Sequence, residues 1–169
     1  MAIGSQYSLL GDDGALIFGA KAGYNFDRKF SLAASIYNLP FRNIVIDPPE
    51  SHDETPYLKM NIYGVEGEYF LMKGTQNFSI GIFAGRGEFK FNVSSFDEAS
   101  EDTYAHNGNF TAIMPFVSYN YVIRPWLRLS ATGGYRFTNG AEYDLFDKTY
   151  TGSDLDGIFL GLIIGFGNF

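Results

Sequence analysis

The chain alternates long segments rich in glycine, aromatic and aliphatic residues with connections that are short and long in turn. The short connections are Asp27–Lys29, Lys73–Asn77 and Arg124–Trp126, and the long ones are Asp47–Pro56, Asp97–Asn109 and Gly140–Asp154. Strict alternation places every second connection at the same end of a sheet, which is typical of up-and-down antiparallel barrels. We therefore expect residues 1–169 to form a single barrel domain.

Eight strands follow from this spacing. We expect them at residues 2–10, 14–26, 30–46, 57–72, 78–96, 110–123, 127–139 and 155–168. The first segment is short, but without it the number of strands would be odd. An even number returns both termini to the short-turn end, as in single-chain bacterial barrels. The predicted fold is an all-β, eight-stranded antiparallel up-and-down transmembrane β-barrel with tight periplasmic turns and longer acidic extracellular loops.

The composition indicates a protein that carries apolar or small residues on two surfaces rather than in a single core. Aromatic residues make up 18% of the chain, and charged residues also 18%, against about 25% charged in a typical soluble domain. The longest uncharged apolar run, residues 157–169, is shorter than the roughly 18–20 residues of a membrane helix. Without cysteine, neither disulfides nor thiol chemistry arise. The start lacks a basic and apolar leader, so we expect a mature form after signal-peptide removal.

Charge is distributed unevenly along the chain, whose net charge is −7. The three long connections and the segment Gly11–Gly14 hold most of the 19 acidic residues, with Lys148 as their only basic residue. The short turns have the reverse bias and carry Arg28, Lys29, Lys73 and Arg124. We expect the basic turns on the periplasmic side and the acidic loops outside the cell.

Pairing across the short turns assigns faces to the strands, because a residue and its partner share a face. Across the first turn Phe26 falls opposite Phe30. Across the middle turn Tyr69 falls near Gly81, an aromatic residue covering a cross-strand glycine. This register predicts that eight charged residues point inward: Lys21, Glu66, Glu68, Arg86, Glu88, Lys90, Arg128 and Arg136.

Charges inside a narrow barrel need partners or water, since an unpaired buried charge costs several kcal/mol. The interior of an eight-stranded barrel is only just wide enough for its own side chains. We therefore predict an interior that is closed by side chains and salt bridges. A gated path for ions or small solutes is the alternative interpretation.

Aromatic residues collect near both ends of the expected strands, which indicates two interfacial girdles. Those near the short turns are Phe26, Phe30, Phe70, Phe78, Tyr121 and Trp126, and those toward the long loops are Tyr37, Phe41, Tyr57, Tyr63 and Phe89. The carboxy-terminal segment GIFLGLIIGFGNF ends in Phe169, although the stronger apolar phase includes Leu160 and Phe166 rather than Phe169.

The alternation, the girdles and this terminal segment together resemble small eight-stranded outer-membrane barrels of the OmpA/OmpX type. The segments GGYRFTNG and DLDGIFLGLIIGFGNF are also similar in style to barrels of Bacteroidetes-type bacteria. The resemblance implies a bacterial outer-membrane location and contact with outer-membrane lipid or lipopolysaccharide. It also implies insertion by the barrel-assembly machinery, which reads a final phenylalanine such as Phe169.

Catalytic chemistry has little support in the sequence. A general base needs an ordered position and an orienting partner, whereas His52 and His106 both fall in long loops. Ser35, Ser118 and Ser130 lie on expected strands that contain no histidine. We predict no enzymatic activity and no cofactor. A lipid-modifying outer-membrane enzyme remains an alternative, and it requires a histidine to approach the rim of the barrel.

The acidic loops are the remaining candidate site, because carboxylate oxygens suit Ca²⁺ and Mg²⁺. The segment SDLDG lacks the full spacing of a calcium loop, so the identity of any metal stays open. Exposed basic residues are too few for a nucleic-acid partner. We expect contact with cations, the cell surface or a protein partner at Asp47, Asp53, Glu54, Asp97, Glu98, Glu101, Asp102, Asp144, Asp147 and Asp154.

The favoured function is therefore that of a small integral outer-membrane barrel with a structural or interaction role. A soluble, lipocalin-like lipid-binding barrel is a further alternative, with a polar exterior around an apolar cavity. The expected outward phase of Ile113, Val117 and Tyr119 argues against that alternative.

Overall fold

A computed structural model describes the backbone of residues 1–10, 13–39, 55–72, 74–94, 103–140, 142–145, 148–151 and 155–167. It describes the side chains of residues 1–10, 14–39, 58–72, 74–90, 107–140 and 155–167. Within these residues there is no helix of the length and apolar character needed to cross a membrane.

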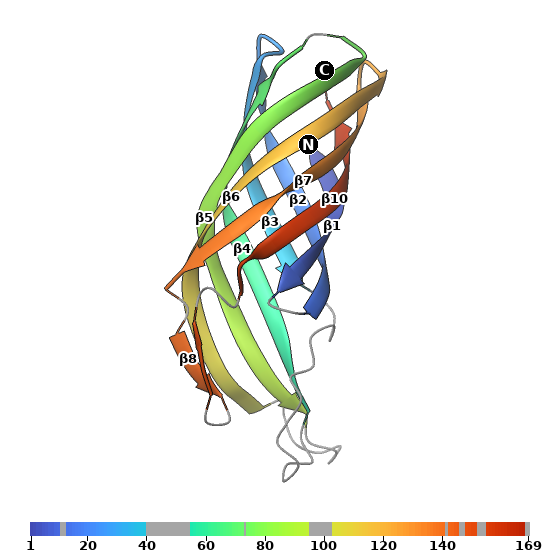
Figure 1. Cartoon of the computed structure of the whole chain (residues 1–169). Coiled ribbons are helices and arrows are strands. Elements are labelled where there is room, and N and C mark those ends of the chain that lie inside the picture. The colour runs from blue at the N-terminus through green and yellow to red at the C-terminus, as the bar shows by residue number, and fades with distance from the viewer. Residues whose placement is uncertain are drawn as a thin grey trace.

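Eight antiparallel strands form a closed barrel (Figure 1), and their neighbour order is β1-β10-β7-β6-β5-β4-β3-β2. The strands are β1 (Ala2–Leu10), β2 (Asp13–Phe26), β3 (Phe30–Leu39), β4 (Thr55–Phe70), β5 (Gln76–Ser94), β6 (Thr103–Arg124), β7 (Leu127–Asn139) and β10 (Gly157–Phe166). Pairing of β1 with β10, from Ala2↔Gly165 to Ser8↔Phe159, closes the barrel. The predicted eight-stranded fold, including a first strand at residues 2–10, is confirmed.

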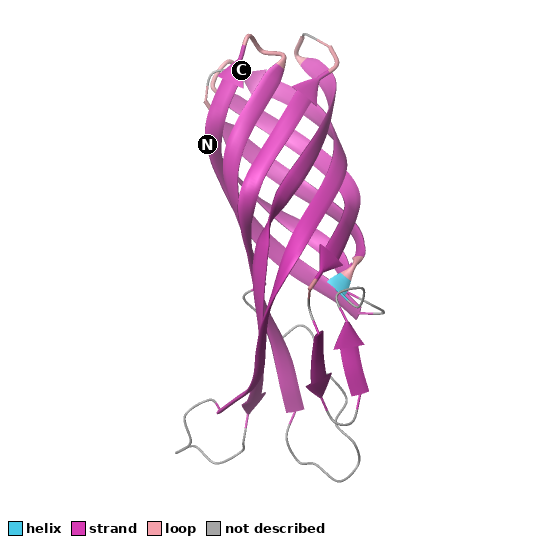
Figure 2. Cartoon of the chain, turned by 90° about the vertical axis from the view of Figure 1, so that its left-hand side faces the viewer, coloured by secondary structure: helices cyan, strands magenta, loops and turns pink. Residues whose placement is uncertain are grey.

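Two features at one end of the barrel were not expected. A separate hairpin of β8 (Glu142–Leu145) and β9 (Lys148–Thr151) lies below the barrel in Figures 1 and 2. Strand β6 also begins at Thr103 rather than at residue 110, so β5 and β6 extend past β7 and β10. Backbone pairing with β5 continues through polar residues such as Asn107 and Asn109, whose sequence had indicated a loop. We call this the loop end, and the opposite end, with the β2–β3, β4–β5 and β6–β7 connections, the turn end.

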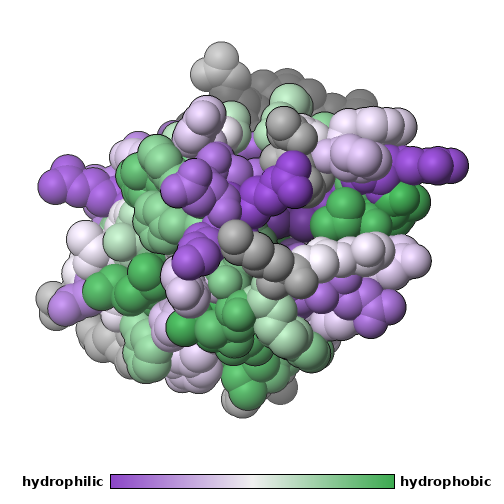
Figure 3. Space-filling view, turned by 90° about the horizontal axis from the view of Figure 1, so that it is seen from above, coloured by the Kyte–Doolittle hydropathy of each residue, from purple (hydrophilic) through white to green (hydrophobic). Residues whose placement is uncertain are grey.

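Outward side chains form an apolar belt around the barrel. Leu160, Val117 and Ile82, from three different strands, are each more than half exposed. Transmembrane barrels present such a belt to lipid. Figure 3 looks onto the turn end and shows polar residues in the middle, with apolar patches around them.

Large aromatic residues extend the belt at the turn end, as the sequence predicts for one girdle. Tyr24 and Phe26 meet edge to face at 5.0 Å between ring centroids, and the exposed rings there are Tyr24, Phe26, Phe30, Tyr69, Phe78, Tyr119, Tyr121 and Trp126. The assignment of Tyr37, Phe70 and Phe89 to the girdles is wrong, because all three are buried on the inner face. Phe41 and the side chain of Tyr57 lie outside the described residues.

The register is as predicted across the first turn and differs across the middle one. Phe26 pairs with Phe30, but Tyr69 pairs with Ile80 rather than with Gly81. A shift of one residue moves every side chain of a strand to the other face. The longer β4–β5 connection permits either register, and burial of the odd-numbered residues of β5 decides between them.

This shift places three of the predicted interior charges on the outer face. Arg86 is exposed, and Glu88 and Lys90 alternate with Phe89, which is fully buried. The prediction that Arg86, Glu88 and Lys90 point into the barrel is therefore wrong.

Glycines make room for inward aromatic rings. A Cβ atom at Gly87 would lie 2.1 Å from Cζ of Phe110, its direct partner on the neighbouring strand. Such covering of a glycine by a cross-strand ring is a device that packs curved sheets. Direct partners of this kind are Gly19 with Tyr37, Gly81 with Phe116, Gly87 with Phe110, Gly108 with Phe89 and Gly134 with Phe159.

These rings belong to an apolar plug that fills the loop-end half of the interior. Phe83 is central to it and meets Tyr37 edge to face at 5.5 Å between ring centroids. The members are Leu10, Ala15, Ile17, Tyr37, Leu39, Leu58, Met60, Ile62, Phe83, Phe89, Phe110, Ala112, Met114, Phe116, Leu155 and Phe159.

The β2–β3 turn carries backbone strain. Asp27 and Arg28 have φ of 49° and 55°, and the Lys29 amide donates a hydrogen bond to the Phe26 carbonyl at 3.0 Å. Two positive φ values characterise a type I′ turn, in which glycine is favoured.

We expect Arg28→Gly to raise the free energy of unfolding by about 1 kcal/mol, because glycine adopts the left-handed conformation without a Cβ penalty. Urea unfolding of the refolded barrel measures this change. Lys29→Gly is the matched control, since Lys29 does not have a positive φ, and it should destabilise the barrel. Equal effects of the two substitutions would contradict the assignment of strain to Arg28.

Candidate functional site

Four charged side chains meet inside the barrel, on the turn-end side of the apolar plug. This ionic cluster consists of Lys21 on β2, Glu66 and Glu68 on β4, and Arg128 on β7. The Lys21 ammonium contacts the Glu66 carboxylate directly and lies 3.9 Å from Oε2 of Glu68. One terminal guanidinium nitrogen of Arg128 lies 3.7 Å from the same Glu68 oxygen. The cluster thus links three strands across the interior.

Hydroxyl groups surround the two carboxylates. Tyr37 donates a hydrogen bond to Oε2 of Glu66 at 3.0 Å, and Ser35 donates to the same oxygen at 3.4 Å. Ser79 donates to Oε1 of Glu68 at 2.5 Å. A carboxylate that accepts several hydrogen bonds in a confined interior is fixed in one orientation.

The hydrogen bonds continue from Glu68 to the far wall of the barrel. The Asn120 amide donates to Oγ of Ser79 at 2.8 Å, and Ser130 donates to Oδ1 of Asn120 at 2.6 Å. All of these groups are buried. Strands β3 to β7 are therefore connected through a single polar layer on the turn-end side of the plug.

The cluster is electrically balanced, because two cations face two carboxylates. Balance and hydrogen bonding offset the cost of removing these charges from water, a cost that isolated ions could not recover. The side chains of Glu66 and Glu68 are each 3% exposed, whereas that of Lys21 is 13% exposed. Chemically the layer holds the barrel wall together and closes the interior with polar contacts.

The eight charged residues expected inside thus separate into three groups. Lys21, Glu66, Glu68 and Arg128 form the ionic cluster, while Arg86, Glu88 and Lys90 lie outside. Arg136 is buried near the loop end, apart from the cluster, and donates hydrogen bonds to the backbone carbonyls of Leu155, at 2.8 Å, and Leu9, at 3.3 Å. Its guanidinium therefore joins β1 and β7 to the segment that precedes β10.

Sequence reasoning did not assign the neutral members of the layer. The aromatic pattern predicts Tyr37 in a girdle, and the strand patterns assign no role to Ser79 or Asn120. A signal was available, because small polar residues occupy alternate positions on neighbouring strands, as in Asn77–Ser79 and Ser118–Asn120. That these residues lie on the same inner face can be concluded only once the register of β5 is known.

The acidic loop residues fall outside what the structure describes. These are Asp47, Asp53, Glu54, Asp97, Glu98, Glu101, Asp102, Asp147 and Asp154, together with the side chain of Asp144. His52 and the side chain of His106 also lie outside it. Within the described part of the chain, no group of three or more His, Cys, Asp or Glu residues is placed to hold a metal ion.

A closed eight-stranded barrel with an outward apolar belt and a filled interior is the fold of the small outer-membrane barrels. Solved structures of that class match nearly the whole chain. Neisserial surface protein A has a TM-score of 0.57 and 14% identity, with 98% of this chain and 92% of that chain covered.

Two further barrels give the same result. The N-terminal β-barrel domain of Pseudomonas aeruginosa OprF has a TM-score of 0.51 at 15% identity, with 98% of this chain and 94% of that chain covered. Ail of Yersinia pestis, in complex with the heparin analogue sucrose octasulfate, has a TM-score of 0.55 at 12% identity, with coverages of 98% and 93%. The sequence matches no protein-family model and no curated protein. At these identities the similarity shows the fold alone.

Proposed function

We propose that the chain is an integral outer-membrane barrel with a structural or interaction role and an interior that does not conduct. The observation that carries this proposal is the combination of an apolar outer belt with an interior filled by the chain's own side chains. A membrane-spanning barrel needs the first feature. The apolar plug and the ionic cluster together supply the second.

The enzyme alternative finds little support in the described residues. Ser35, Ser118 and Ser130 are all buried, and their hydroxyls donate to Glu66, Thr132 and Asn120 respectively. A lipid-modifying serine would have to face the bilayer instead. The lipocalin-like alternative requires a polar exterior, which the apolar belt contradicts.

Lipid headgroups are the partner that we propose for the outer charges near the loop end. Arg86 pairs in register with Tyr63, where the apolar belt ends, and Lys90 lies directly opposite Lys59. Arginine and lysine side chains at a membrane interface bind the phosphates of lipid headgroups. We propose that phosphates of outer-leaflet lipopolysaccharide bind at this level, and that the acidic loops beyond it meet divalent cations or a protein partner.

Refolding tests the proposal as a whole. The chain should migrate differently on a gel before and after heating once it has been refolded in detergent, and it should aggregate in buffer without detergent. In planar bilayers the refolded protein should give no discrete conductance steps, because the plug leaves no continuous path. A monodisperse protein in plain buffer would refute the membrane location, and regular conductance steps would refute the closed interior.

The headgroup contact has a separate test in vesicles prepared with or without lipid A. Added lipid A should raise the free energy of unfolding of the wild type, and Arg86→Gln should reduce that increment. Lys29→Gln removes a cation at the turn end and is the matched control. An increment that Arg86→Gln leaves unchanged would refute phosphate contact at Arg86.

A further inference from the structure

The turn end of the barrel is hollow. A cavity of about 630 Å³ lies between the β2–β3, β4–β5 and β6–β7 turns, and a second of about 440 Å³ lies beside it along β1, β2, β3 and β10. Both are lined by Asn25, Arg28 and Arg128, and we call the two adjacent cavities together the vestibule. The ionic cluster is its floor, because Lys21 and Glu68 also line the smaller cavity.

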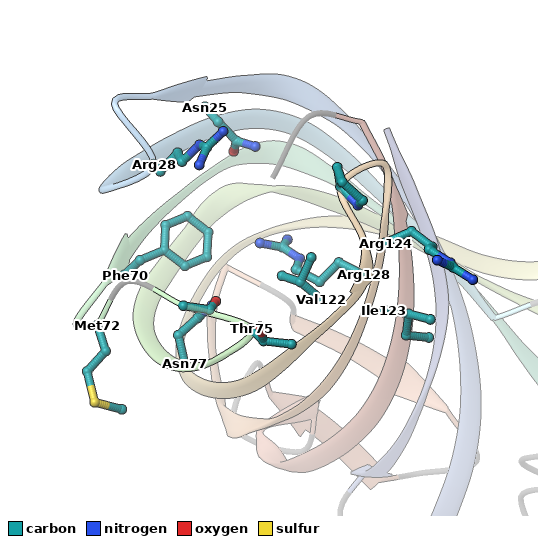
Figure 4. A pocket seen from close by; sticks show the side chains of 12 residues that line it. Asn25, Arg28, Phe70, Met72, Thr75, Asn77, Val122, Ile123, Arg124 and Arg128 are labelled. Carbon is teal, nitrogen blue, oxygen red and sulfur yellow. The ribbon is translucent and has the colours of Figure 1, made fainter.

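The larger cavity of the vestibule is positively charged. Among the described residues that line it, the charged ones are Arg28, Arg124 and Arg128. Figure 4 shows Arg128 in the middle of the barrel mouth and Arg28 beside Asn25, whereas the side chain of Arg124 is directed away from Arg128. Arg28 and Arg128 are therefore the two cations that an occupant of this space would meet.

Arg28 occupies a position at which arginine is unfavourable. Its φ of 55° would suit glycine. Among the described interactions, no hydrogen bond or ion pair involves the Arg28 side chain, so the fold itself does not require an arginine here. Strained residues that persist in this way gather at ligand-binding sites. An arginine at this turn places its guanidinium at the mouth of both cavities.

Asn77 supplies an independent observation on the opposite wall. Its side chain is buried and lines the larger cavity, and its Oδ1 atom accepts no hydrogen bond from the described residues. Nδ2 of the same amide donates to the Gly74 carbonyl at 3.4 Å. A buried acceptor without a donor costs about 1–3 kcal/mol, so this wall favours an occupant that donates a hydrogen bond.

We propose that the vestibule binds a small molecule that carries an oxyanion, either a carboxylate or a phosphate, next to a hydroxyl or ammonium group. Arg28 and Arg128 bind the oxyanion, since the guanidinium fork matches both groups. Asn77 accepts a hydrogen bond from the neighbouring donor. Phe70 lines the same cavity and contacts the carbon skeleton of the ligand.

The proposal is tested with the refolded barrel in detergent, by following the Asn25 and Asn77 side-chain amide resonances during titration. The probes are inorganic phosphate, serine and phosphoserine at constant ionic strength, with glycerol as the neutral control. We expect saturable shifts with phosphoserine or serine, which carry both groups, and weaker binding of phosphate alone. Preference for phosphoserine over serine identifies a phosphate ligand, and equal binding identifies a carboxylate.

Two variants separate the site from the fold. Arg28→Gln should weaken binding about tenfold or more, the loss expected for one charge-assisted hydrogen bond. Lys29→Gln makes the same charge change in the same turn, but Lys29 lines neither cavity, so binding should change less than about twofold. Arg28→Gly should lose binding while the barrel gains stability, which excludes misfolding as the cause.

Two outcomes would overturn the proposal. One is the absence of saturable shifts with every anionic probe. The other is an equal loss of binding in Arg28→Gln and Lys29→Gln, which would show a general attraction to basic turns. Either result can occur in a barrel that still shows heat-modifiable migration, so it would leave the proposed membrane function standing.

Discussion

Replacing Lys21 with methionine is expected to lower the free energy of unfolding by about 3–5 kcal/mol, the loss typical when one partner of a buried ion pair is removed. The substitution keeps the volume of the side chain but leaves the Glu66 carboxylate, of which only 3% is exposed, without its cation. Tyr37 and Ser35 would still donate to Glu66, yet neither carries a charge. Urea unfolding of the barrel, refolded in lipid vesicles, measures the change.

A second substitution isolates the electrostatic part of this loss. Glu66→Gln in the Lys21→Met background removes the orphaned charge and keeps an oxygen that can accept from Tyr37. The double variant should recover most of the lost stability, because a buried ion pair is worth little relative to a neutral pair. If the double variant is as unstable as Lys21→Met alone, the ionic cluster does not act as a balanced pair.

Replacing Phe83 with alanine is expected to cost about 3–5 kcal/mol, because the truncation leaves a cavity in the apolar plug. Phe83 is 1% exposed, and its ring lies against Tyr37 and over Gly64 and Gly85. The closed backbone around the plug cannot collapse to fill that volume. Equilibrium unfolding in urea provides the measurement.

Ile82→Ala is the matched control for Phe83→Ala. Ile82 is the preceding residue, but it faces outward and is 51% exposed. Its truncation should cost about 1–2 kcal/mol, since it loses contact with lipid or detergent and creates no cavity. Similar losses in the two variants would mean that the interior of the barrel is not tightly packed.

Part of the candidate site could be predicted from the sequence. The alternation of polar and apolar residues on β2, β4 and β7 is enough to turn Lys21, Glu66, Glu68 and Arg128 inward. Which of them meet depends on the stagger between strands that are far apart in the chain. The hydroxyl group with which Ser79 binds Glu68 was not predictable either, because Ser79 lies on β5, whose phase depends on the middle turn.

The sequence by itself determined the number of strands, their order, and the faces of the strands joined by tight turns. A period of two is a local property, and a turn as short as Asp27–Lys29 leaves a single register. The tertiary structure decided the register of β5, and with it the placement of Arg86, Glu88 and Lys90. The longer β4–β5 connection is compatible with either register of β5. Packing of Phe83 and Phe89 inside the closed barrel selects the register that is observed.

The alternation of short and long connections likewise does not predict the vestibule. Its cations come from a strained turn on one side of the barrel and from β7 on the other, and closure of the barrel brings them to one space. Sequence patterns specify which side chains face inward on strands that are joined by tight turns. Only closure of the sheet, which fixes distances between strands that are remote in the chain, specifies which side chains share the interior.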